Sequence, residues 1–402
     1  MVLQWSCNGP ERYPLYRSGS LAVDNRCPRM KIAHVVRSYG SLTEPFVAQR
    51  VSQVGADVQL WYERLAGPAP GVPSRRMPWL PLRARPFDGL LYRTPGIAIR
   101  IGAPAYQWIE RLEQPDVIHA HYLTTGCLVG HRTVSPLVVS CYGFDVLRIP
   151  TNPSWRRSIG ELIPRASMFL VEGPHMAAAL SGIGIPDSKI ALVPIGASLQ
   201  EIEFADYTAR RACALLITGR FVAKKGISVA IRALAALGTR SSPPTLDIVV
   251  DGPLRETLVR MVSDLGLNSR VTFHGYVSRM QYLALVASAE LVLAPSVTAP
   301  DGDTEGGAPT TILDAQATGT IVIGSRHADI PFLVQDDTTG YLAAEGDAHD
   351  LALTIERAFA TRSEWARIAL AARHQVEARH SDAAVWAALG RVHTRALSAK
   401  IE

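Results

Sequence analysis

Short apolar runs alternate with longer helical patterns along most of the chain, starting with a strand-like run at Met30. The first series of buried-strand runs then covers residues 54–61, 117–121, 137–141 and 168–171. A second series covers residues 214–219, 245–251, 271–274, 291–294 and 321–324. Apolar runs separated by helices are typical of parallel strands that are buried on both faces. Two successive series therefore predict two doubly wound α/β domains rather than one large domain.

The join between the domains is expected within residues 197–211, a polar stretch with three acidic residues. This predicts an N-terminal domain at 30–205, a C-terminal domain at 206–380 and a terminal helical segment at 381–402. Residues 1–29 lack a hydrophobic period, and we interpret them as a disordered leader or as sequence ahead of a start at Met30. Residues 75–100 hold six arginines and four prolines, which predicts a mobile loop.

Composition excludes several protein classes. A chain of 402 residues that is 48% hydrophobic can bury a large core. Its best apolar run, residues 283–295, is interrupted by Glu290 and falls short of the roughly 20 residues needed to span a bilayer. The N-terminus does not resemble a secretion signal, so we expect a cytoplasmic protein. Five scattered cysteines favour reduced thiols over a disulfide framework or a zinc site.

Positive charge is concentrated in the N-terminal half. Residues 1–200 carry 21 Lys and Arg against 13 Asp and Glu, a net +8, whereas the remaining residues carry 20 against 23, a net −3. This asymmetry favours an anionic partner for the N-terminal half, such as a phosphorylated acceptor or the inner face of the plasma membrane. Scattered, solvated arginines are the alternative interpretation.

A glycine-containing acidic loop, residues 301–309, follows the strand at 291–294 and leads into a helical pattern. Pro309 suits a helix start, where backbone amides and the helix dipole attract anions. Gly306 and Gly307 would let a phosphate approach the backbone, beside Ala308 and the hydroxyls of Thr310 and Thr311. We expect Glu305 to bond sugar hydroxyls and Asp314 to reach a ribose diol. The alternative is a solvated helix start.

A basic turn, residues 218–226, follows the first strand of the C-terminal domain. It brings Arg220 and Lys225 to the carboxyl end of a strand, where they can neutralise a diphosphate leaving group. Together with the acidic loop, this turn predicts a nucleotide-diphosphate site.

Two further strand ends in the N-terminal half carry candidate groups. His119 and His121 lie on one face of a strand, and His121 is nearer the carboxyl end, where α/β sheets bind ligands. Without a third ligand we expect no metal there. Tyr142 and Asp145 follow another strand, where Asp145 either faces a ligand or caps a helix. Asp301-Gly302-Asp303 imitates a D-x-D metal motif, but we interpret it as loop.

These motifs, in this order, resemble the retaining GT-B glycosyltransferases of family 4, particularly bacterial exopolysaccharide and colanic-acid-type enzymes, over about residues 30–375. Residues 41–46 resemble the family's S-E-T-F signature, residues 140–146 its S-F-H-G-F-D-V, and residues 219–226 its G-R-x-x-x-K-K-G. The Asp251-Gly252-Pro253 turn, residues 271–275 and the acidic loop with its helix also match.

The resemblance implies two Rossmann-like domains that face each other across a cleft, with the terminal helix crossing back to the first. It implies retaining transfer of a hexose-type sugar from a nucleotide-diphosphate sugar to a glycan or lipid-linked acceptor in polysaccharide biosynthesis, without a further cofactor. The catalytic candidates are His121, Glu305, Arg220 and Lys225. The donor-binding candidates are Arg220, Lys225, Gly252, His274, Gly275, Glu305, Gly306, Gly307, Ala308, Pro309, Thr310, Thr311 and Asp314. The acceptor-binding candidates are Glu44, Tyr142 and Asp145.

The chain departs from the family pattern at two places. Tyr142 stands where the family often has histidine. The usual pair of glutamates with seven residues between them is altered, because Asp314 replaces the second and Gly306 occupies the place of the first. Glu305 lies one residue early, and we assign the role to it.

Other functions stay open. A nucleotide-sugar epimerase on the same fold and a catalytically silent sugar-binding protein are the alternatives. A nucleic-acid-binding role is disfavoured because basic and aromatic residues form no RNA-reading pattern. A dehydrogenase is disfavoured because no G-x-G-x-x-G follows a strand.

Overall fold

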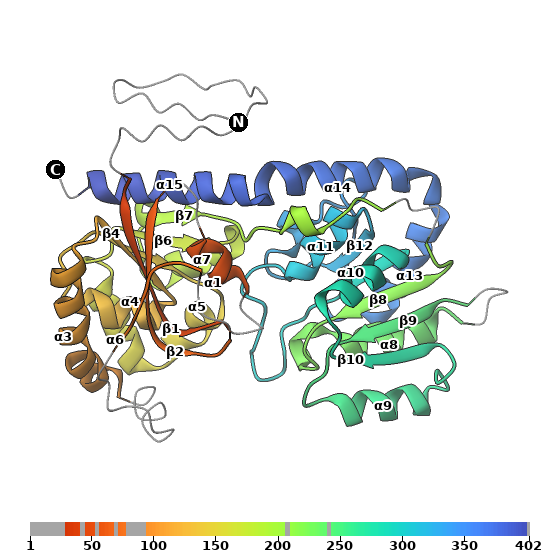
Figure 1. Ribbon diagram of the computed structural model, residues 1–402. Coiled ribbons are helices and arrows are strands. Elements are labelled where there is room, and N and C mark those ends of the chain that lie inside the picture. Colours follow the sequence, from red (N-terminus) through yellow and green to blue (C-terminus); the bar gives the residue numbers. More distant parts are fainter. Residues whose placement is uncertain are drawn as a thin grey trace, which may run out of the picture.

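The computed structural model describes residues 29–40, 45–52, 56–67, 71–77, 94–205, 210–238 and 243–399 (Figure 1). Within these residues, seven parallel strands form the first sheet, in the order β3-β2-β1-β4-β5-β6-β7. They are β1 (Lys31–Tyr39), β2 (Asp57–Leu65), β3 (Ser74–Arg76), β4 (Val117–His121), β5 (Leu137–Ser140), β6 (Met168–Val171) and β7 (Ile190–Leu192).

In the same described part of the chain, six parallel strands form a second sheet, in the order β10-β9-β8-β11-β12-β13. They are β8 (Ala214–Thr218), β9 (Thr245–Val249), β10 (Val271–Gly275), β11 (Leu291–Ala294), β12 (Ile321–Ser325) and β13 (Tyr341–Ala343). The strand order reverses between β1 and β4 in one sheet and between β8 and β11 in the other. Ligands of doubly wound sheets bind at such reversals, outside the carboxyl ends of the strands.

Helices cover both sheets and bury their apolar faces. The N-terminal helices are α1 (Pro45–Val51), α3 (Pro95–Glu113), α4 (Leu123–Gly130), α5 (Phe144–Leu147), α6 (Pro153–Leu162) and α7 (Pro174–Gly182). The C-terminal helices are α8 (Ile227–Ala236), α9 (Arg255–Asp264), α10 (Arg279–Ser288), α11 (Thr310–Thr318), α12 (Ile330–Leu333), α13 (Ala348–Ala360), α14 (Trp365–His380) and α15 (Asp382–Ser398). No helix among the described residues has the length and apolar character needed to cross a membrane.

The last two helices form one long run that passes over both domains (Figure 1). The chain is extended at Ser381, whose side chain accepts the Ala384 amide and caps α15. α14 packs beside α11 of the C-terminal domain, whereas α15 packs on β4 and β5 of the N-terminal domain. Val385, Leu389 and other apolar residues of α15 are buried against this first sheet. The terminal helix therefore completes the hydrophobic core of a domain that lies far away in sequence.

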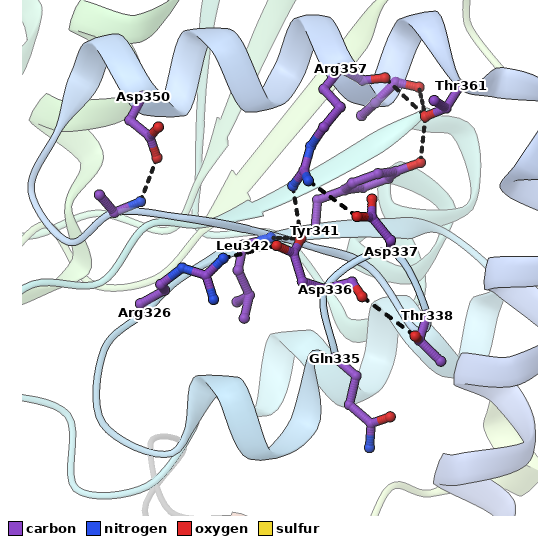
Figure 2. A network of polar contacts seen from close by, with 12 residues as sticks. Arg326, Gln335, Asp336, Asp337, Thr338, Tyr341, Leu342, Asp350, Arg357 and Thr361 are labelled. Atoms are coloured by element: carbon purple, nitrogen blue, oxygen red, sulfur yellow. Dashed lines mark hydrogen bonds and ion pairs between the residues drawn. The ribbon is translucent and has the colours of Figure 1, made fainter.

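A network of ion pairs holds the edge strand β13 (Figure 2). Asp336 accepts the Leu342 amide at 2.9 Å and pairs with Arg357 at 2.7 Å and Arg326 at 2.8 Å. Burial would raise the pKa of Asp336, but the amide and the two arginines outweigh burial and lower this pKa. Arg357 also lies over the Tyr341 ring. Since these charges satisfy one another, we interpret the network as structural.

The structure confirms the fold class and corrects parts of the predicted layout. The strands expected at 117–121, 168–171 and 291–294 are found with those bounds. The prediction of a mobile loop at 75–100 was wrong at both ends, because Ser74–Arg76 pairs with β2 and α3 begins at Pro95. Residues 78–93 lie outside the described residues. The domain boundary at 205/206 stays a prediction, since residues 206–209 are also outside the description.

Candidate active site

Glycine keeps the basic turn after β8 tight. A short 3-10 helix, Ala223–Lys225, leads from the turn into α8. Gly226 has a positive φ of 63°, and a Cβ there would lie 1.8 Å from the Pro295 carbonyl oxygen, so only glycine fits. The turn leaves Arg220 exposed and directs Lys225 towards the acidic loop.

Ion pairs join the basic turn to the acidic loop. Lys225 Nζ lies 2.7 Å from Glu305 Oε1, and Ser296 Oγ donates to the same oxygen at 3.1 Å. Lys224 pairs with Asp303 at 3.2 Å. Burial alone would raise the pKa of the Glu305 carboxyl, but Lys225 and Lys224 outweigh burial and hold this pKa below its usual value. An ionised glutamate and a cation therefore meet at the place where the sequence predicts a donor site.

The two glycines of the acidic loop touch the N-terminal domain. A Cβ on Gly306 would lie 2.2 Å from the Cα atom of Gly143, and one on Gly307 would lie 2.1 Å from Glu172 Oε2. No side chain fits at either loop position unless a neighbour moves. The prediction that these glycines admit a phosphate stays untested, while the structure gives them a second use as points of direct contact with the N-terminal domain.

Asp314 lies on α11 and is only 8% exposed. Its two carboxylate oxygens accept from Arg279 Nη2 at 2.8 Å and Arg279 Nη1 at 2.7 Å. A bidentate pair of this kind fixes both groups and raises the pKa of Arg279 through the hydrogen bonds to Asp314. A ribose diol at Asp314 would therefore also lie beside Arg279, a residue that the sequence analysis did not single out.

The start of α11 contributes the remaining loop residues. The helix begins at Thr310, with Pro309 in the capping position before it. Ala308, Thr310 and Thr311 are half-buried there. These residues stay predicted ligands of the donor.

The other donor candidates lie at the carboxyl ends of β9 and β10. His274 Nε2 lies 2.7 Å from Asp247 Oδ1 on the neighbouring strand. Gly275 has a positive φ of 68° and its carbonyl accepts the Val250 amide at 2.8 Å. A Cβ on Gly252 would lie 2.6 Å from the Phe221 amide nitrogen, so this glycine packs against the basic turn.

His121 is buried at the end of β4, with both ring nitrogens engaged. Its Nδ1 lies 2.6 Å from the Tyr142 hydroxyl, and its Nε2 lies 2.9 Å from His34 Nδ1. Burial is the main reason why the pKa values of His121 and His34 lie well below the usual value, so both rings are neutral. Of the hydrogen-bonded residues His34, His121 and Tyr142, only the half-buried Tyr142 has a side chain that reaches the surface.

A second set of buried polar groups adjoins His34 and His121. His119 bonds His393 of α15 at 3.0 Å and Ser140 at 2.7 Å, and Arg50 donates to Ser140 at 2.7 Å. The rings of His119 and His121 stack with centroids 4.9 Å apart. His393 and Arg50 were not predicted from the sequence. His34, like His119 and His121, lies in a predicted strand, which was the available signal for it, but nothing local indicates the partner residues.

Asp145 is used inside the N-terminal domain. Its carboxylate accepts the Leu123 amide at 2.8 Å and the Tyr142 amide at 2.9 Å. Burial raises the pKa of Asp145 to about 6, against the opposing effect of these amides. The contact with Leu123, the first residue of α4, agrees with the alternative interpretation as a helix cap. Acceptor binding by Asp145 and Tyr142 stays a prediction, and Glu44 lies outside the described residues.

Two acidic residues that the sequence analysis missed lie where the domains meet. Glu172 follows β6, and burial together with the nearby Asp329, Asp145 and Glu305 raises the pKa of Glu172 to about 8. Asp329, from the C-terminal domain, accepts the His175 amide at 2.7 Å at the start of α7. A strand followed by an acid and a glycine was the available signal for Glu172, since Asp145 likewise lies beside a glycine turn at the end of a strand.

Comparison with known proteins covers both domains. Residues 47–201 match a family model described as Glycosyltransferase Family 4, and residues 209–375 match one described as Glycosyl transferases group 1. The chain is 30% identical over 268 residues to the amylovoran biosynthesis glycosyltransferase AmsK of Erwinia amylovora, which covers 65% of this chain and 66% of that protein. It spans 58% and 53% of the next two curated relatives, and so no more than about two thirds of these proteins.

Solved structures share the fold. The sucrose-phosphate synthase of Thermosynechococcus elongatus has a TM-score of 0.74 at 20% identity, covering 92% of this chain and 100% of that chain. HepE of Anabaena in complex with UDP-glucose has a TM-score of 0.68 at 18% identity, covering 91% and 99%. These likenesses concern the fold, and they agree with two doubly wound domains in the GT-B arrangement.

Proposed function

Since the chain belongs to the family 4 glycosyltransferases, we propose that it transfers a hexose-type sugar from a nucleotide-diphosphate sugar to a glycan or lipid-linked acceptor, with retention at the anomeric carbon. The observation that carries this proposal is the contact between Lys225 and Glu305 beside the exposed Arg220. The polysaccharide context is supported by AmsK, an amylovoran biosynthesis glycosyltransferase. A UDP-sugar is the first donor to test, because HepE was solved with UDP-glucose.

In this proposal the donor lies between the basic turn and the acidic loop. Lys225 and Arg220 bind the diphosphate, and Glu305 accepts a hydrogen bond from a sugar hydroxyl. When the bond from the anomeric carbon to the diphosphate breaks, negative charge grows on the leaving oxygen, and the two cations stabilise it more than they stabilise the bound donor. The acceptor hydroxyl attacks the face that the diphosphate leaves and gives its proton to the departing diphosphate oxygen, so no protein nucleophile is required.

The N-terminal domain supplies the other side of the reacting sugar. The paired rings of His121 and Tyr142 lie at the end of β4 and β5, and the acidic loop approaches the same edge at Gly143. Closure of the two domains over a bound donor would exclude water and so limit hydrolysis of the donor. We assign His121 a positioning role: it orients the Tyr142 hydroxyl towards the reacting sugar.

The test is turnover of candidate donors with and without acceptor. Thermal shift with UDP- and GDP-sugars selects the donor, because a ligand that binds only the folded state raises the melting temperature. Mass spectrometry of acceptors should then show the added hexose, and NMR should show the donor's anomeric configuration retained. An epimerised donor in the absence of acceptor would favour the epimerase, and binding without turnover would favour a silent sugar-binding protein. Either result overturns the proposal.

A further inference from the structure

Four large apolar side chains are exposed on one face of α3. They are Ile97, Ile101, Trp108 and Leu112, with exposed fractions of 56%, 40%, 57% and 60%. At about 100° per residue these positions fall within an arc of roughly 60° around the helix axis. Single exposed apolar residues are ordinary, but a continuous stripe along a helix marks an interaction surface. We call these four residues the α3 stripe.

The charges beside the α3 stripe are positive. Arg100 and Arg111 are exposed, and the same helical spacing puts both along one border of the stripe. The two acidic residues of the helix are turned away and engaged. Glu110 is 4% exposed and accepts the Ser135 amide at 2.7 Å, while Glu113 pairs with Arg75 at 2.9 Å. The exposed face of α3 therefore combines apolar side chains with cations and presents no exposed carboxylate of its own.

More cations lie on the neighbouring elements. Arg165 bonds the ring of His131, which follows α4, at 3.1 Å. Burial and then Arg165, Arg132 and Arg100 lower the pKa of His131, with Glu161 acting in the opposite direction. Arg165, Arg132 and Arg100, from three segments, therefore lie around His131 on this flank, together with Glu161. Figure 1 shows α3 on the outer side of the N-terminal domain, away from the C-terminal domain.

We propose that α3 binds an anionic lipid surface, with the α3 stripe inserted among the acyl chains near the headgroups and Arg100 and Arg111 bound to lipid phosphates. A tryptophan among aliphatic residues, flanked by arginines, is the pattern of helices that lie in the membrane interface. The helix, with 19 residues, is about 28 Å long, enough to contact several headgroups at once. This surface is separate from the basic turn and acidic loop, so the proposal does not rest on the transferase activity.

The test uses the full chain and vesicles of phosphatidylcholine, alone or mixed with phosphatidylglycerol, in a co-sedimentation assay. We expect binding to the anionic vesicles that weakens with salt. The triple variant Ile101→Ser, Trp108→Ser, Leu112→Ser should bind at least about tenfold more weakly. The matched control is Leu353→Ser with Leu370→Ser, because these leucines are both 49% exposed, on α13 and α14 of the other domain.

A second measurement locates the inserted side chain. Brominated lipids should quench part of the tryptophan fluorescence of the native chain, and the variant Trp108→Phe should lose that part. Equal binding of the native chain and the triple variant would overturn the proposal. So would a dimer in solution that the triple variant dissociates, because the α3 stripe would then be an interface between two copies of the chain.

Discussion

Replacing Lys225 by methionine leaves a buried carboxylate without its main partner. Lys225 and Glu305 are 2.7 Å apart, and their side chains are 21% and 11% exposed. At an effective dielectric constant of about 20, the attraction at this distance is about 6 kcal/mol, and desolvation of both charges offsets part of it. Removing one partner of a buried pair commonly costs about 3–5 kcal/mol. Because Ser296 still bonds Glu305, we expect Lys225→Met to lower the free energy of unfolding by about 3 kcal/mol, at the low end of this range.

Activity should fall as well as stability. Loss of one preorganised cation from the diphosphate should lower transfer by roughly a hundredfold or more. The double variant Lys225→Met, Glu305→Gln should regain most of the stability, because the unpaired charge is gone, but it should not regain transfer. Lys224→Met is the comparison for stability. Lys224 pairs with the more exposed Asp303, so this variant should lose about 1 kcal/mol or less of the free energy of unfolding.

Urea unfolding measures the stability, and initial rates of acceptor-dependent nucleoside-diphosphate release measure the transfer. In the native chain Lys225 keeps the pKa of Glu305 below its usual value, so the pair stabilises the fold above that usual pKa and the contribution disappears in acid. The deficit of Lys225→Met should therefore be largest near neutral pH and shrink as pH falls. Near-normal transfer by Lys225→Met would refute the reasoning. Recovery of transfer in the double variant would also refute it, because Lys225 would then serve only to neutralise Glu305.

Three further changes test other parts of the site. Gly307→Ala places a Cβ 2.1 Å from Glu172 Oε2 and should lower both melting temperature and transfer, whereas Gly182→Ala, which meets nothing within 4 Å, should change neither. The pKa of Glu172 is raised from 4.5 to about 8, so the free energy of unfolding of the native protein should fall by up to about 1.4 kcal/mol for each unit that the pH rises between these values. Glu172→Gln should remove this pH dependence, as urea unfolding at several pH values would show. His34→Leu leaves His121 Nε2 unpaired and should lower kcat with little change in KM, and His34→Asn should restore part of kcat in steady-state kinetics.

Most of the fold could be predicted because a buried parallel strand can be recognised from a short run of consecutive residues. β6 and β11 are uninterrupted apolar runs, β4 is a buried run in which His119 and His121 alternate with apolar residues, and the predicted bounds of all three match the structure. The strands that were missed, β3, β7 and β13, have three residues each, too few for a pattern. Backbone pairing with a neighbouring strand makes them strands, and such pairing leaves no sign in the side chains of β3, Ser-Arg-Arg.

The residues of the candidate site also fall into a group that could be predicted from local motifs and a group that could not. Lys225 and Glu305 could be predicted because each belongs to a short motif at the end of a strand, and a common sheet edge brings such ends together. The partner of Asp314 could not, because Arg279 reaches it from another helix 35 positions earlier. His393 is further still from His119, by 274 positions. Contacts of this kind depend on how helices pack, which a pattern along one segment does not encode.

The position of α15 has a consequence for biosynthesis. All described strands of the first sheet have been synthesised once Leu192 has been made, yet Val117, Val138 and Leu170 pack beneath residues of α15 that are translated more than two hundred positions after them. One apolar face of the early domain therefore stays uncovered while the whole later domain is synthesised. Such a delay exposes hydrophobic surface to chaperones and to aggregation. A nascent chain arrested before α15 should be the most aggregation-prone species on the way to the native protein.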